Sequence, residues 1–225
     1  MKVYCISDIH GCLWELEEAM TIIEEHLYED DTILCLLGDY IHGGPDNYEV
    51  LDRIMNLQKQ FGRDKVIALM GNHEDLFLNG YTSINDDDSD YEEIDDKYHT
   101  WMWNLPTYHV EGNTIFVHAG IDEEAGEEWE WGTSDETFTG KYPADIGKIE
   151  GISKKVVAGH VGTAEISGDP NFHDIYYDGQ SHYYIDGSVV KSGVLPILLV
   201  DTDTDKYYSV KDSGIEEVQP YSQKN

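Results

Sequence analysis

Positive charge is scarce in this sequence. Its 225 residues include 14 lysines and arginines against 46 aspartates and glutamates, which gives a formal net charge of −32 at pH 7. Only two of the basic residues, Arg53 and Arg63, are arginines. A field of this sign repels phosphate backbones and anionic lipid headgroups. The composition therefore predicts a protein that binds neither nucleic acid nor membranes.

The sequence also lacks a disulfide framework, a long apolar run and an interdomain linker. Its only cysteines are Cys5, Cys12 and Cys35. They are odd in number and lie in or beside expected strands, which indicates buried thiols in a reducing compartment. No run approaches about 18 apolar residues, and the apolar start at 1–6 is too short for a signal peptide. We expect a cytoplasmic protein with one domain over 1–212 and a frayed tail over 213–225.

Apolar periodicity predicts an α/β fold. In the first half, strands are expected at 3–6, 32–37 and 65–70, with amphipathic helices over 13–27 and from 47 onward. This alternation is typical of a mainly parallel sheet. In the second half, the pattern predicts a hairpin over 108–117, an acidic helix over 123–131 with Trp129 and Trp131 partly packed, and strands at 156–158, 183–186, 194–200 and 206–210.

An acidic insertion at about 79–105 interrupts this rhythm. Its run from Asn85 to Glu93 is expected to be a solvated loop. The spacing of Asp86, Asp88 and Asp90 resembles the start of a calcium loop, but the required glycine and terminal glutamate do not follow, so we reject that interpretation. The apolar segment 101–106 is expected to close the insertion as a lid beside the site.

Polar side chains follow five of the expected strands. They are Asp8, His10, Asp39, Asn72, His73, His118 and His160. Open α/β sheets bind ligands at the carboxyl ends of their strands. Asp8 and His10 are two residues apart, so in extended backbone both side chains point to the same side. This mixture of carboxylates, imidazoles and one amide suits two divalent ions, Mn first, with Fe or Zn as alternatives.

Each of these residues also has an ordinary structural interpretation. A single Asp after a strand is usually a turn or a helix cap, and a single His is usually a satisfied polar group. Five such strand ends in one chain are difficult to obtain by chance. Two ions that share Asp39 would clamp a displacement at phosphorus, with a bridging hydroxide as the attacking group. His73 follows the ligand Asn72, so it is placed to protonate the leaving oxygen.

The ordered motifs resemble those of a known family. They read Ser7-Asp8-Ile9-His10-Gly11, Gly38-Asp39, Gly71-Asn72-His73-Glu74, His118-Ala119-Gly120 and Gly159-His160. This set is similar to the five motifs of the calcineurin-like metallophosphoesterases, nearest to their bacterial phosphoprotein (serine/threonine) phosphatase branch. The resemblance spans residues 3 to about 200.

The resemblance implies a role for each matching residue. Asp8 and His10 would bind the first metal ion, Asp39 would bridge the two ions, and His73 would be the general acid. The second ion would be held by Asn72, His118 and His160. The implied fold is a four-layer αββα sandwich, in which two mixed β-sheets are flanked by helices.

The second motif departs from the family pattern. That branch reads Gly-Asp-x-x-Asp-Arg-Gly, but this chain has His42 and Gly43 where the family has Asp and Arg. The change removes the carboxylate that orients the catalytic histidine and a guanidinium that binds phosphate. Neither Arg53 nor Arg63 occupies a matching position. We hypothesise that His42 contacts the substrate as a cation.

Several functions are compatible with this altered pocket. The leading interpretation is a metal-dependent phosphoesterase acting on phosphomonoesters, either small molecules or phosphoproteins. A phosphodiesterase and a symmetrical diadenosine tetraphosphate hydrolase are the enzymatic alternatives, and a metal-binding domain that has lost turnover is the non-enzymatic one. The remaining histidines, which are His26, His99, His109, His173 and His182, are expected to be structural or surface residues.

Overall fold

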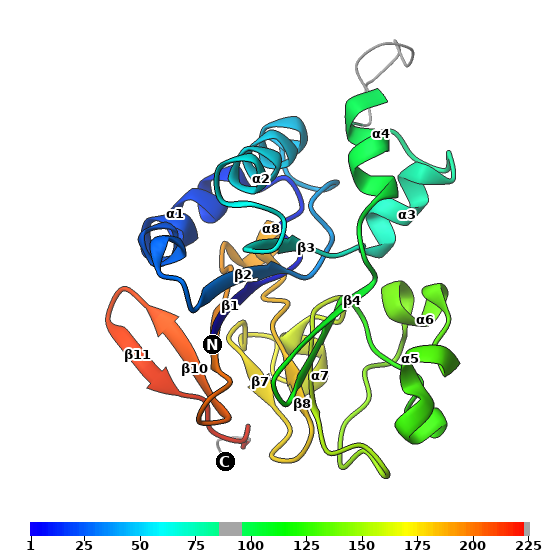
Figure 1. The fold of residues 1–225 in the computed structure, drawn as a ribbon, viewed down its shortest axis with the longest axis vertical. Helices are drawn as coiled ribbons and strands as arrows, with labels where there is room; N and C mark the ends of the chain where they lie inside the picture. Colours follow the sequence, from blue (N-terminus) through cyan, green and yellow to red (C-terminus); the bar gives the residue numbers. More distant parts are fainter. Residues whose placement is uncertain (86–95, 223–225) are drawn as a thin grey trace.

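A computed structural model of the chain describes residues 1–85 and 96–222. The described strands form two mixed sheets (Figure 1). The first sheet has the order β11-β10-β9-β1-β2-β3, with β1 (Lys2–Ile6), β2 (Thr32–Leu36), β3 (Val66–Ala68), β9 (Ile197–Asp201), β10 (Lys206–Lys211) and β11 (Gly214–Glu217). The second has the order β4-β5-β6-β8-β7, with β4 (Tyr108–Glu111), β5 (Thr114–Val117), β6 (Lys155–Ala158), β7 (Tyr176–Tyr177) and β8 (His182–Tyr184).

Helices cover the outer faces of both sheets. Figure 1 shows α1 and α2 on one side of the molecule and α5 and α6 on the other. The described helices are α1 (Leu13–Ile23), α2 (Asn47–Phe61), α3 (Asn72–Leu78), α4 (Asp96–Trp103), α5 (Trp129–Gly132), α6 (Asp135–Gly140), α7 (Thr163–Ser167) and α8 (Val189–Ser192), with 3-10 turns η1 (Glu24–Tyr28) and η2 (Glu123–Glu128). None of them is long and apolar enough to cross a membrane.

Alternation along the strands separates the core into layers. In β1, Val3 and Cys5 pack between the two sheets, whereas Tyr4 and Ile6 face the helices. A third cluster lies between the second sheet and its helices and includes Trp129. Because both faces of β1 are covered, its sequence from Val3 to Ile6 is apolar. The four-layer αββα sandwich predicted from the sequence is confirmed, as are three buried free thiols.

Two segments differ from their predicted structures. The segment from 101 to 106 does not form a lid, because Trp101 and Met102 of α4 are buried in the core with α2. The indole of Trp101 donates a hydrogen bond to Gln58 of α2 at 2.8 Å. The predicted solvated loop, Asn85 to Glu93, lies outside the described residues except for Asn85. The rejected calcium loop, with Asp86, Asp88 and Asp90, lies wholly outside them.

The tail expected to fray from residue 213 contains strand β11, which pairs antiparallel with β10. Beyond it, the Val218 amide donates to the Tyr207 carbonyl at 2.8 Å, and the Tyr221 ring packs 4.7 Å from the ring of Phe172. The expected partial packing of Trp131 is also wrong, since this side chain is 87% exposed. Its neighbour Trp129 is buried.

Candidate metal centre

The parallel strands end at neighbouring edges of the two sheets, and the predicted residues lie there. Asp8 and His10 follow β1, Asp39 follows β2, Asn72 and His73 begin α3 after β3, His118 follows β5, and His160 follows β6. Hydrogen bonds join the two edges. The His160 amide donates to Asp8 Oδ2 at 3.0 Å, and His118 Nδ1 lies 3.0 Å from the Leu37 carbonyl oxygen. The structure therefore brings motifs from both sheets together.

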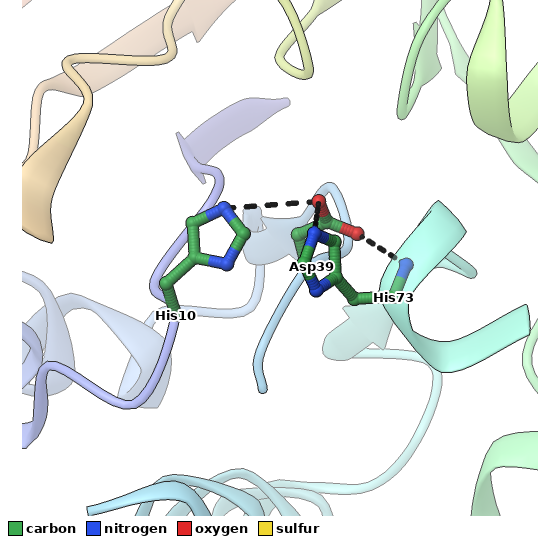
Figure 2. A group of neighbouring side chains, drawn as sticks. All are labelled: His10, Asp39 and His73. Carbon is green, nitrogen blue, oxygen red and sulfur yellow. Dashed lines mark hydrogen bonds and ion pairs between the residues drawn. The ribbon is translucent and has the colours of Figure 1, made fainter. Parts of the chain in front are cut away.

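Asp39 lies at the centre of this arrangement. Its Oδ2 atom is 3.8 Å from Nε2 of His10 and 3.8 Å from Nε2 of His73, and Figure 2 shows both rings beside the carboxylate. Its Oδ1 atom is 3.4 Å from His118 Nε2 and accepts a hydrogen bond from the His73 amide at 3.0 Å. The two carboxylate oxygens thus face different groups of imidazoles, as a bridging ligand would.

The proton positions on the rings follow from their carbonyl partners. A carbonyl oxygen only accepts, so His118 Nδ1 donates to Leu37 and His10 Nδ1 donates to Ile41 at 3.2 Å. In the neutral rings, Nε2 of each histidine then carries a lone pair that faces Asp39. Backbone carbonyls orient metal-binding histidines in the same way.

The atoms that would bind metal here suit cations, because atoms that accept hydrogen bonds lie against one another. Asn72 Oδ1 lies 3.0 Å from His118 Nε2, which itself lies 3.4 Å from Asp39 Oδ1. His160 Nδ1 is 2.9 Å from the same amide oxygen. The neutral His118 has no proton to share at Nε2, whereas a cation among these atoms would satisfy all of them. Among the residues that the structure describes, two groups have ligand atoms within 4.8 Å of one another, His10-Asp39-His73 and Asp39-His118-His160.

Burial determines the charge states of these groups. Burial raises the pKa of Asp8 to about 7, and burial together with the charges of Glu74 and Asp8 raises the pKa of Asp39 well above its usual range. Burial lowers the pKa of His118 and of His160, which favours the neutral, metal-binding imidazole. Neighbouring cations would offset the cost of ionising the two buried carboxylates.

The backbone at the strand ends adopts left-handed conformations. The φ angles are 56° at Asp8, 49° at His10, 55° at Asp39, 73° at His42 and 63° at His160. The extended backbone expected for Asp8 and His10 is therefore wrong, although His10 Nε2 still comes within 3.9 Å of Asp8 Oδ1. Such conformations are uncommon for residues other than glycine, and they cluster where the surrounding structure fixes a functional site.

Neither arginine of the chain lies at these strand ends. Arg53 forms ion pairs with Glu17 and Glu24 on the outer helices, and Arg63 is exposed beyond the far end of α2. At Gly43, an added Cβ would lie 3.2 Å from the Val190 side chain. Neither Arg53 nor Arg63 therefore supplies a guanidinium at the place where the family motif has its arginine.

His42 does not have the arrangement expected of a cation that contacts the substrate. Its Nδ1 atom lies 2.8 Å from Nδ1 of His73, and its Nε2 atom lies 2.6 Å from the carbonyl oxygen of Ser83. Both ring nitrogens are therefore directed to groups of the protein itself. This geometry favours a role in contacts within the protein instead of contact with the substrate.

Two buried carboxylates were missed as candidate site residues. Glu74 accepts hydrogen bonds from three backbone amides around Asp39. Asp186 follows β8, and burial, together with the charge of Asp8, raises its pKa to about 7. The second omission was avoidable, because Ile185-Asp186 repeats for a sixth time the pattern of an apolar strand followed by a polar residue. Glu74 stands in the Gly71-Asn72-His73-Glu74 motif, but its position in the sequence did not reveal its contact with the Asp39 amide across the fold.

The chain belongs to the calcineurin-like phosphoesterase family, whose model matches residues 1–196. The family resemblance identified from the motifs is thereby confirmed. Members of this family use two metal ions, and the two donor groups around Asp39 agree with that requirement.

Curated relatives resemble part of this chain, and a solved structure shares its fold. A symmetrical bis(5'-nucleosyl)-tetraphosphatase of Nitrosospira multiformis is 30% identical over 129 residues, which cover 54% of this chain and 44% of the relative. One of Erwinia tasmaniensis is 33% identical over 130 residues, covering 54% and 45%. The alignments thus span less than half the length of these relatives. A cold-active protein-tyrosine phosphatase from a psychrophilic Shewanella shares the fold, with a TM-score of 0.64, 17% identity and coverage of 97% and 80%.

Proposed function

We propose that this chain hydrolyses phosphate esters at the cluster around Asp39, with phosphomonoesters as the main substrates. Asp8, His10 and Asp39 would hold one divalent ion. A second would be held by Asp39 together with Asn72, His118 and His160. The donor set suits Mn²⁺ first, with Fe or Zn as alternatives. When bound, the two ions would activate water and neutralise the charge that develops on the phosphoryl group.

The single observation that carries this proposal is the meeting of acceptor atoms at Asp39. Carboxylate, amide and imidazole acceptors, of which those of Asp39 and His118 are buried, approach one another within 3.0 to 3.8 Å there, an arrangement that costs free energy unless cations lie among them. His73 is partly exposed and its Nε2 atom lies at the same centre, 3.8 Å from Asp39 Oδ2. It is therefore placed to pass a proton to the leaving oxygen of a bound ester.

A second candidate function is the cleavage of dinucleoside polyphosphates. The names of the relatives with 30% and 33% identity favour it. The chain's own residues favour it less, because neither arginine lies at the site and a polyphosphate chain carries several negative charges. Phosphomonoesters, with one phosphoryl group to neutralise, fit the available residues better.

The test uses metal-stripped protein reloaded with Mn²⁺. Its substrates are p-nitrophenyl phosphate, bis-p-nitrophenyl phosphate and diadenosine tetraphosphate, with Asp39→Asn as the control variant. We expect hydrolysis that requires both Mn²⁺ and the Asp39 carboxylate, fastest with the monoester. Preference for the tetraphosphate would establish the second candidate. Mn²⁺ binding without hydrolysis of any substrate would show that this is a metal-binding domain without turnover.

A further inference from the structure

Two histidine rings meet beside the candidate metal centre. The Nδ1 atoms of His42 and His73 are 2.8 Å apart, and the ring centroids are 5.0 Å apart at 45°. A contact this short between two ring nitrogens requires one proton between them, with one ring donating and the other accepting. The direction of donation determines which nitrogen of His73 keeps its lone pair.

The carbonyl of Ser83 determines that direction. His42 Nε2 lies 2.6 Å from this oxygen, which can only accept, so the proton of a neutral His42 is on Nε2. Nδ1 of His42 is then an acceptor, and His73 must donate from its own Nδ1. In the neutral pair the Nε2 atom of His73 is left without a proton, and it lies 3.8 Å from Asp39 Oδ2. His73 must therefore first take up a proton from solvent at Nε2 before it can act as the general acid.

Other contacts hold His42 and Ser83 in these positions. The His42 amide donates to Asn47 Oδ1 at 2.9 Å, at the start of α2. The amide group of Asn47 donates in turn to the Ile84 carbonyl at 3.1 Å, and the Ile84 side chain is fully buried. The segment that supplies the Ser83 carbonyl is thus joined to the same helix end as the loop that carries His42. This arrangement gives the first part of the insertion a role in the site.

We propose that His42 is a positioning residue for His73. Anchored on the Ser83 carbonyl, its Nδ1 atom accepts the proton of His73 Nδ1 and fixes the ring of His73 with Nε2 toward Asp39. The family motif has a carboxylate in this place, whereas this chain uses a neutral imidazole as the acceptor. The catalytic consequence of this contact rests on the proposed function, but the orientation of the ring does not.

The first measurement is made without metal or substrate, at about pH 8.5, where an ordinary imidazole is neutral. Chemical shifts of the ring nitrogens, recorded on protein with ¹⁵N-labelled histidine and assigned with His73→Gln, distinguish the two neutral tautomers. We expect the proton of His73 on Nδ1 and that of His42 on Nε2. A His73 ring that carries its proton on Nε2, or that averages between tautomers as in a free imidazole, would overturn the proposal whether or not the protein is an enzyme.

Two variants separate the two contacts of His42. In His42→Asn, the side-chain oxygen lies close to the place of Nδ1 and can accept from His73, and asparagine tolerates the positive φ of 73°. In His42→Gln, the amide nitrogen can reach the Ser83 carbonyl, but the acceptor for His73 is lost. We expect the Asn variant to keep the His73 tautomer and the Gln variant to lose it. Thermal unfolding of both variants shows whether backbone strain at residue 42 destabilises either protein.

Kinetics of the Mn²⁺-loaded protein complete the test. Loss of an orienting partner typically costs about ten- to a hundredfold in activity. We expect His42→Gln to lower kcat by about that factor with little change in KM, and His42→Asn to stay within about threefold of wild type. A rise in KM alone, equal in both variants, would instead indicate that His42 binds substrate. If wild type itself hydrolyses none of the esters, the proposed function fails while the ring-nitrogen result still decides the orientation of His73.

Discussion

The carboxylate of Glu74 holds the backbone of Asp39. Its Oε2 atom accepts from the Asp39 amide at 2.8 Å and from the Gly71 amide at 3.1 Å, and its Oε1 atom accepts from the Tyr40 amide at 2.8 Å. Glu74 is fully buried and has the N3 position of α3, from which its carboxylate accepts from the amide of the N-cap residue Gly71. One side chain thus joins the end of β2 to the start of the helix that carries Asn72 and His73.

Replacing Glu74 by Gln tests this relationship. Glutamine keeps the size of the side chain but has one acceptor oxygen, and its amino group would face a backbone N–H. Because a buried amide left without a partner costs about 1–3 kcal/mol, and a charged acceptor is also lost, we expect a loss of roughly 2–4 kcal/mol in the free energy of unfolding. Urea unfolding measures it. The matched control is Asp75→Asn, at an exposed position of the same helix, which should change stability by less than about 0.5 kcal/mol. Equal effects of the two variants would contradict the role of Glu74.

Gly159 provides a second test, because its backbone approaches Asp8 closely. An added Cβ would overlap Asp8 Oδ2 and Ser7 Oγ. We expect Gly159→Ala to displace the Asp8 carboxylate and to weaken Mn²⁺ binding by at least about tenfold, as measured by calorimetric titration. At Gly140 an added Cβ meets no atom within 4 Å, so Gly140→Ala should bind Mn²⁺ as wild type does. Unchanged affinity in Gly159→Ala would show that Asp8 does not hold the ion.

The repetition of one local pattern explains why so much of the site was predictable. Each apolar strand ends in a polar residue, and the carboxyl ends of parallel strands meet at one edge of a sheet. The apolar runs and their lengths therefore placed Asp8, Asp39, Asn72, His118 and His160 at strand ends before any contact was known. The left-handed backbone at three of these residues was not predictable, because it depends on contacts between strand ends far apart in sequence.

Contacts across the fold account for what the sequence did not reveal. The Glu74 carboxylate contacts the Asp39 amide, and the His42 ring contacts the Ser83 carbonyl. These residues are about 35 and 41 positions apart in the sequence, and no short-range pattern encodes such contacts. Strand β11 was mistaken for a frayed tail because its side chains are exposed, so it has little apolar alternation. Its order comes from backbone pairing with β10 instead.

The two tryptophans of α5 form a natural pair for measuring burial. Trp129 is 4% exposed and packs against Tyr108 and Phe138, whereas Trp131, two residues later, is 87% exposed. We expect Trp129→Ala to lower the free energy of unfolding by about 3–5 kcal/mol, since it leaves a cavity in the outer core of the second sheet. Trp131→Ala should change it by less than about 0.5 kcal/mol. Chemical denaturation compares them, and a similar loss in both variants would contradict the packing described for α5.

His182 forms a buried ion-pair cluster at the start of β8. Its Nδ1 atom lies 2.8 Å from Asp178 and its Nε2 atom 2.7 Å from Glu123, so both nitrogens donate and the ring carries a positive charge. Burial opposes this charge, but the hydrogen bonds to Asp178 and Glu123 outweigh it and raise the pKa of His182 to about 9. Burial also opposes ionisation of Asp178, yet its hydrogen bonds to His182 and to backbone amides lower its pKa to about 2.

These two shifts predict how stability depends on pH. In the unfolded chain His182 titrates near about 6.5, so its contribution is complete below that pH and is lost as the pH rises through about 9. The Asp178 contribution is present above about 3.8 and is lost as the pH falls toward about 2. Between pH 6 and 9.5, wild type should therefore lose on the order of 3 kcal/mol more than His182→Gln, as measured by urea unfolding at both pH values. Parallel pH profiles for the two proteins would mean that His182 is neutral in the folded state, because only a protonated ring can lose this stabilisation as the pH rises.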